Sequence, residues 1–184
     1  MEKITDKTGR IAFIGGGMMA EAILKGMLHK EIAEPEMIII SDPSAGRREY
    51  LEKTYKVNTT GCNAEAVKSA GFVILAVKPQ VADAAITKEV ADAIPQNTTV
   101  LSIMGSVNLD KLHKLVPGHA VIRVMPNTPL AVGCGMTAIA PDENVSEEML
   151  DVAKAVFGSC GEIEIIAESA IEAIAAVSGC GPGY

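Results

Sequence analysis

The stretch RIAFIGGGMMAEAILKG, residues 10–26, decides the fold. Residues 11–14 form an unbroken apolar run, which is typical of a strand buried on both faces. Three glycines end the run, and apolar residues then recur at helical spacing. The members of this predicted buried stripe are Ala20, Ile23, Leu24 and Met27. The stretch therefore predicts a strand that turns directly into a helix.

The glycines at this turn match a dinucleotide fingerprint. Gly15, Gly17 and Ala20 fit the pattern G-x-G-x-x-G/A. The first N–H groups of a helix lack backbone partners and lie at the positive end of its dipole, so they attract a pyrophosphate. The alternative is a glycine-rich loop that closes an ordinary βα unit. The position between a strand and a helix favours the dinucleotide site.

Composition excludes several classes of protein. The chain has 184 residues, 48% of them hydrophobic, and a formal net charge of −7. This acidity predicts no nucleic-acid partner and no binding to anionic membranes. No apolar run is long enough to span a bilayer, and residues 1–10 do not read as a signal peptide. The four cysteines and three histidines are scattered, which predicts free thiols, no metal site and a cytoplasmic location.

Strand and helix patterns alternate along the chain. Apolar runs predict further strands at residues 37–41, 56–58, 72–77, 99–103, 120–124, 134–140 and 162–166. Periodic or capped segments predict helices at residues 45–55, 63–69, 81–94, 146–157 and 168–177, with a short helix opened by Asn108. We expect Asn63 to cap the second of these, and Asn144 and Glu147 to form a capping box. The alternation predicts a doubly wound, mostly parallel α/β sheet with right-handed crossovers.

The end of the second predicted strand bears on coenzyme choice. Asp42 lies where an acid accepts hydrogen bonds from the adenosine ribose, which favours NAD. Arg47 and Arg48, one helical turn on, could instead pair with the 2′-phosphate of NADP. A helix cap for Asp42 and a solvated helix face for the arginines are the alternatives.

Four motifs together resemble pyrroline-5-carboxylate reductase. They are IGGGMMAEAILKG at 14–26, VILAVKPQ at 73–80, VIRVMPNTPLAVGCGMT at 121–137 and AVSGCGPGY at 176–184. The resemblance implies a Rossmann-type domain at 1–166 and the start of an all-helical dimerisation and substrate domain at 167–184. It also implies a homodimer or higher homo-oligomer that reduces the imine 1-pyrroline-5-carboxylate to L-proline with NADPH or NADH. The substrate-binding remainder of that helical domain would lie beyond this chain.

The resemblance also implies the site residues. The positions that would contact the coenzyme are Gly15, Gly17, Met18, Met19, Ser41, Asp42, Asn63, Ala76, Val77, Lys78, Pro79, Met125, Asn127 and Thr128. Ser178 and Gly179 would open the helix that contacts the substrate carboxylate.

The chain departs from the family at three places. The family's S-x-A-A-G turn reads SIMGS here, at residues 102–106. Cys180 and Gly183 alter the final glycine-rich motif, and Asp42 and Pro43 stand where many members have Asn-Arg. NADP and NAD therefore both stay open. Two other functions also stay open: a non-catalytic, reductase-like nucleotide-binding or regulatory protein, and a dehydrogenase for another small acid.

Overall fold

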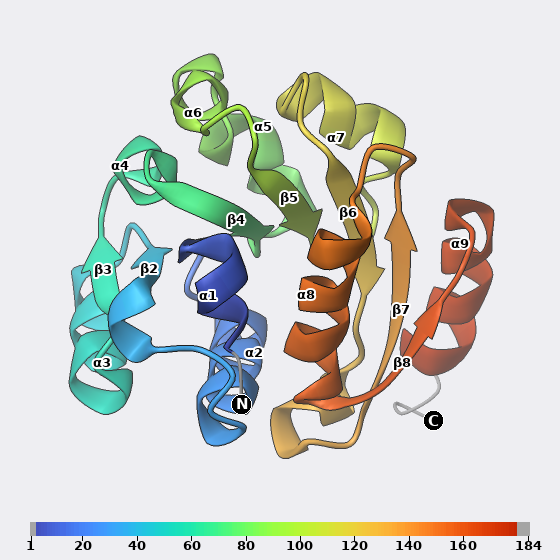
Figure 1. Ribbon diagram of the computed structural model, residues 1–184, viewed down its shortest axis with the longest axis horizontal. Helices are drawn as coiled ribbons and strands as arrows, with labels where there is room; N and C mark the ends of the chain where they lie inside the picture. Colours follow the sequence, from blue (N-terminus) through green and yellow to red (C-terminus); the bar gives the residue numbers. More distant parts are fainter. Residues whose placement is uncertain (1–2, 180–184) are drawn as a thin grey trace.

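The computed structural model describes residues 3–179, which form one eight-stranded sheet flanked by helices (Figure 1). The spatial order is β3-β2-β1-β4-β5-β6-β7-β8. The strands are β1 Arg10–Ile14, β2 Ile38–Ser41, β3 Asn58–Thr60, β4 Ala70–Leu75, β5 Thr99–Ser102, β6 Val121–Met125, β7 Gly135–Pro141 and β8 Gly161–Ile165. From β3 to β6 all neighbours are parallel, β7 runs antiparallel to β6, and β8 is parallel to β7. The predicted mostly parallel, doubly wound sheet is confirmed.

Helices cover both faces of the sheet (Figure 1). Those packed on one face are α1 Ile4–Thr8, α2 Met18–His29, α3 Ala45–Tyr55 and α8 Glu147–Gly158. Those packed on the other face are α4 Asn63–Val67, α5 Ala82–Ala85, α6 Lys88–Ala93 and α7 Leu109–Leu115. Short helical turns lie at Pro35–Met37, Pro79–Val81 and Thr128–Val132. The last described segment is helical in three pieces, Glu168–Ala170, α9 Ile171–Ile174 and the π-helix Ala175–Gly179.

The opening stretch folds as its pattern predicts. The four stripe residues of α2, Ala20, Ile23, Leu24 and Met27, are all fully buried. They belong to the same core cluster as Phe13 of β1, whereas Ala12 and Ile14 belong to the cluster on the opposite face. The strand is therefore buried on both sides, as its unbroken apolar run requires.

Several predicted boundaries are wrong for local reasons. The helix expected at 81–94 is two helices, because the backbone leaves helical geometry at Ile86 and the Thr87 side chain caps a new start by accepting from the Val90 N–H. The third strand begins at Asn58 rather than 56, because Lys56 adopts a left-handed conformation that ends α3. Helix α1 was not predicted, since its five residues carry one large apolar side chain and show no periodicity.

Two predicted helix caps are also wrong. The α4 cap is Cys62, without a side-chain hydrogen bond, while Asn63 donates to the Ala85 carbonyl at 2.8 Å. The cap of α8 is Ser146 rather than the Asn144 capping box, and its hydroxyl accepts from the Met149 N–H at 3.3 Å. Asn108 caps α7 as predicted.

Replacing Ser146 with alanine removes the side-chain partner of an otherwise unpaired helix amide. We expect the free energy of unfolding to fall by about 1 kcal/mol. Urea unfolding followed by circular dichroism measures the change. Ser44→Ala, which removes the cap of α3, is the comparison at a more exposed helix; an unchanged midpoint for Ser146→Ala would contradict the capping role.

Candidate coenzyme site

The carboxyl ends of the parallel strands meet at one edge of the sheet, and the loops that follow them gather there. In open α/β sheets, ligands bind outside this edge. The predicted coenzyme residues lie on or beside the segments that follow β1, β2, β3, β4 and β6: Gly15, Gly17, Met18, Met19, Ser41, Asp42, Asn63, Ala76, Val77, Lys78, Pro79, Met125, Asn127 and Thr128. Residues that are far apart along the chain are thus gathered at one edge of the sheet.

The turn between β1 and α2 combines a tight backbone with open space. Gly15 has φ +99°, and a Cβ added there would lie 2.8 Å from the Ala76 carbonyl oxygen, so a side chain does not fit. Gly17 is the N-cap of α2; a Cβ there would meet no atom within 4 Å, and no side chain caps the helix. The first-turn N–H groups therefore face an open cradle with the polarity and room that a pyrophosphate needs.

Side chains from the second βα unit hold this turn. Asp42 Oδ2 accepts from the Gly16 N–H at 3.0 Å, and its other oxygen accepts from the Ser44 N–H at 2.9 Å. Arg47 Nε donates to the Gly16 carbonyl at 2.5 Å. The peptide groups on both sides of Gly16 are thus fixed from the adjoining unit, and Ser44, rather than Asp42, caps α3.

Glu21, on the first turn of α2, completes this arrangement. Arg47 Nη2 donates to its Oε2 at 2.5 Å, and the hydroxyls of Tyr50 and Tyr55 donate to its Oε1 at 2.9 and 2.7 Å. Burial acts to raise the pKa of Glu21, but the hydrogen bonds from Tyr55, Arg47 and Tyr50 outweigh it and hold that pKa below its usual range. Burial and the Glu21 carboxylate together raise the pKa of Tyr55.

Replacing Glu21 with glutamine tests this arrangement. At pH 7 we expect the free energy of unfolding to fall by about 2 kcal/mol, because three hydrogen bonds to a charged acceptor weaken. A lowered folded-state pKa stabilises the fold above the unfolded-state pKa of about 4.3, and this stability is lost as pH falls through the folded-state pKa. The difference between variant and wild type should therefore shrink below pH 4, and urea unfolding at pH 7 and pH 3 measures it.

The control for Glu21→Gln is Glu49→Gln on α3. Glu49 forms an ion pair with Lys53, and both side chains are well exposed. An exposed pair of this kind contributes at most about 1 kcal/mol. Equal stability of Glu21→Gln and wild type at pH 7 would show that the pairing does not stabilise the turn.

Besides Asp42, three of the predicted coenzyme residues have side chains that are bonded to protein partners. Ser41 is fully buried, and its hydroxyl donates to the Phe13 carbonyl at 3.2 Å. Asn127 accepts from the Met136 N–H at 2.9 Å and donates to the Ser178 carbonyl at 3.3 Å. With Asn63 bonded to Ala85, these side chains shape the site rather than project into it. The sequence did not reveal this, because the partners lie 9 to 51 positions away along the chain.

The predicted substrate residues close the described part of the chain. Ser178 and Gly179 belong to a π-helical segment, and the Ser178 hydroxyl donates back to the Ile174 carbonyl at 3.0 Å. They thus lie within the last described helical segment, and the rest of the helix that they were expected to open, residues 180–184 with Cys180 and Gly183 among them, lies outside the described residues. A Cβ on Gly179 would lie 3.6 Å from Met125 Cε, so this end of the chain reaches the predicted nicotinamide side of the site.

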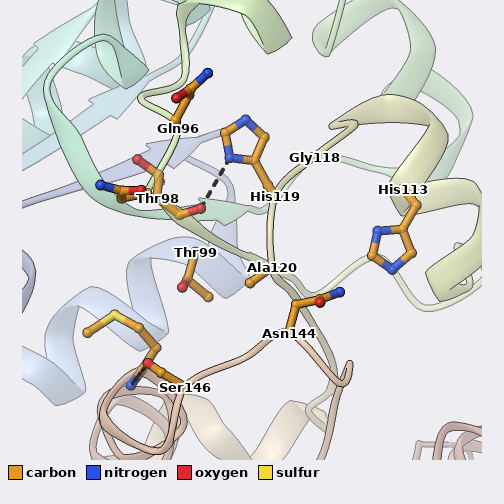
Figure 2. A pocket seen from close by; sticks show the side chains of 11 residues that line it. Gln96, Thr98, Thr99, His113, Gly118, His119, Ala120, Asn144 and Ser146 are labelled. Carbon is orange, nitrogen blue, oxygen red and sulfur yellow. Dashed lines mark hydrogen bonds between the residues drawn. The ribbon is translucent and has the colours of Figure 1, made fainter.

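A cavity of about 590 Å³ lies at the opposite edge of the sheet (Figure 2). It is lined by residues that precede or begin β5 and β6, among them Thr98, His119 and Ala120, and by residues at the start of α8. His119 Nδ1 lies 3.2 Å from the Thr98 carbonyl oxygen. A dashed line marks this hydrogen bond in Figure 2. The cavity is therefore separate from the glycine turn, and its size does not mark it as the coenzyme site.

Two further observations bear on the predicted absences. Within residues 3–179, no three His, Cys, Asp or Glu side chains come together as metal ligands. In the same range no helix has both the length and the apolar character that crossing a bilayer requires.

The parallel sheet, the glycine turn and the edge cluster define an α/β domain of the Rossmann type, the class of fold that binds dinucleotides. The chain belongs to the family described as NADP oxidoreductase coenzyme F420-dependent, which matches residues 10–106.

More specifically, the resemblance to pyrroline-5-carboxylate reductases is confirmed. The chain is 42% identical to the pyrroline-5-carboxylate reductase of Synechocystis, over 95% of this chain and 65% of that protein, and 34% identical to that of Escherichia coli K12, with the same coverage. Its fold matches the enzyme from Coxiella burnetii with a TM-score of 0.90 and 30% identity, over 95% and 65% of the two chains. It also matches the Plasmodium falciparum pyrroline carboxylate reductase with NADP bound, at a TM-score of 0.84 and 29% identity, over 95% and 64%. The chain thus spans slightly less than two thirds of these relatives.

Proposed function

We propose that this chain binds a nicotinamide dinucleotide at the carboxyl edge of its sheet. The observation that carries the proposal is the turn from β1 to α2, where Gly15 cannot hold a side chain and Gly17 leaves the helix amides open. Families that bind dinucleotides use this combination because the pyrophosphate must approach the backbone closely. The P. falciparum relative, which has NADP bound, supports the same conclusion.

We further propose that the whole protein reduces 1-pyrroline-5-carboxylate to L-proline. The names of the relatives and the shared motifs support this substrate. The coenzyme supplies a hydride, and a protonated cyclic imine already accepts hydride well, so the protein's task is to align the two and exclude water. Residues 167–184 would begin the helical substrate and dimerisation domain, with Ser178 and Gly179 near the substrate carboxylate.

The arginines bear on the choice between NADPH and NADH. Arg47 pairs with Glu21 and the Gly16 carbonyl, and Arg48 Nη1 donates to the Asp42 carbonyl at 2.7 Å. Both guanidinium groups therefore already have protein acceptors, and the Asp42 carboxylate just after β2 would repel a 2′-phosphate bound beside it. We expect NADH to bind at least as tightly as NADPH.

The proposed setting is a cytoplasmic homodimer or larger homo-oligomer. Cys62, Cys134 and Cys160 are free thiols in the described part of the chain, which supports a reducing compartment. The oligomer follows from the resemblance and stays a prediction, which light scattering of the purified protein tests.

Calorimetric titration with NADH and NADPH, followed by nicotinamide absorbance after addition of the imine, tests the proposed function. Saturable binding with consumption of the reduced coenzyme supports an imine reductase. Binding without consumption by the whole protein, substrate domain included, supports the non-catalytic nucleotide-binding alternative. Absence of binding for both coenzymes would overturn the proposal.

A further inference from the structure

Alternate residues of β6 and the turn after it contact the last described segment of the chain. Arg123 pairs with Glu168 and Glu172, at 3.1 and 2.8 Å. Two residues on, the Met125 side chain lies beside Gly179, and two further on Asn127 donates to the Ser178 carbonyl. A single strip of the sheet therefore holds residues 168–179 from one end to the other.

Arg123 is the charged member of this strip, and its side chain is only 2% exposed. Burying a charge is costly unless it is paired and hydrogen-bonded. The guanidinium meets both acids and also donates to the Gly105 carbonyl at 2.7 Å, while its Nε has no partner among the described residues. Its hydrogen bond is the main cause that holds the pKa of Glu172 below its usual range.

The same contacts tie the C-terminal segment to two other parts of the site. Gly105 lies in the loop after β5, at the carboxyl edge of the sheet. Glu168 Oε1 also accepts from the Leu109 N–H at 2.6 Å, at the start of α7. One buried cation and one carboxylate therefore fix the loop between β5 and α7 together with residues 168–179.

We propose that Arg123 is a positioning residue that couples the coenzyme edge of the sheet to the segment bearing Ser178 and Gly179. The proposal rests on the coenzyme site proposed above. Arg123 does not touch the reacting atoms; it acts through Glu168 and Glu172, which set where the segment lies beside Met125. Without this anchor the segment keeps its short helices but loses its fixed place beside the nicotinamide side of the site.

Hydrogen exchange of peptides that cover residues 168–179, measured with and without saturating NADH and NADPH, tests the coupling. The variants are Glu172→Gln, the double variant Glu168→Gln with Glu172→Gln, and the conservative Arg123→Lys. Asp92→Asn, which breaks the exposed ion pair with Lys88 on α6, is the matched control. Glu172 is 68% exposed, so its single variant keeps the test valid if the double variant fails to fold.

In wild type we expect bound coenzyme to slow exchange in residues 168–179. In the double variant we expect exchange there to rise about tenfold and the coenzyme-dependent protection to disappear, with the coenzyme Kd changed by less than about threefold. Arg123→Lys should keep part of the protection, because the charge remains, and Asp92→Asn should behave as wild type.

Unchanged exchange in both glutamine variants, or coenzyme protection that survives in them, would overturn the positioning role. A wild type that binds neither coenzyme contradicts the proposed function instead, and the exchange rates without coenzyme then still decide whether Arg123 anchors the segment.

Discussion

Replacing Gly17 with aspartate is expected to weaken coenzyme binding by at least about a hundredfold. A side chain here enters the open space above the first turn of α2, where a Cβ meets no protein atom within 4 Å. A carboxylate in that space accepts the helix amides itself and repels a pyrophosphate; two like charges about 4 Å apart cost about 4 kcal/mol at an effective dielectric constant near 20. Isothermal titration calorimetry measures the loss.

The fold should tolerate this change, which separates binding from stability. Aspartate is among the best N-cap residues, so the free energy of unfolding should stay within about 1 kcal/mol of wild type. Gly17→Asn is the neutral control of nearly the same size, and we expect it to lose about tenfold in affinity. If Gly17→Asp bound NADH as wild type does, the pyrophosphate would lie elsewhere and the coenzyme site would have to be placed anew.

The fold was predictable where burial is uniform along an element. The central strands β1, β2, β4, β5 and β6 are nearly all buried, so their apolar runs were visible in the sequence. β3 at the edge has no fully buried residue, and its boundary was predicted two residues early. The sequence also did not predict the break in the helix expected at 81–94, because alanine and valine residues on both sides of Thr87 continue the helical pattern across it.

The backbone turn of the site could be predicted from the sequence, whereas the side-chain pairs around it could not. Gly15 and Gly17 carry a signal in their own spacing, because a tight turn and a close approach exclude side chains. The pairings of Glu21 with Arg47 and of Arg123 with Glu168 depend on which segments the topology brings together, 26 and 45 positions apart. No local pattern reports such pairs, and Arg123 in particular reads as an interruption of an apolar strand.

Replacing Gly15 with alanine is expected to lower both stability and coenzyme affinity. The residue has φ +99°, a conformation that side chains rarely adopt, and an added Cβ would lie 2.8 Å from the Ala76 oxygen and 3.0 Å from Val77 Cγ1. Backbone strain costs about 1–3 kcal/mol, and the clash adds to it, because the carbonyl belongs to the segment that leaves β4. Urea unfolding should show a loss of about 3 kcal/mol, and affinity for NADH should fall at least about tenfold as the turn shifts.

The control for Gly15→Ala is Gly46→Ala, which lies in α3 at ordinary helical φ with no atom within 4 Å of the added Cβ. There alanine should stabilise the protein by about 0.5–1 kcal/mol, because glycine is a poor helix former. The two substitutions add the same methyl group, so opposite signs of the stability change isolate the backbone of the turn as the cause. If Gly15→Ala were as stable as wild type, the loop after β4 would move to admit the methyl group with no loss in the free energy of unfolding. The inference that the pyrophosphate binds a rigid turn would then be wrong.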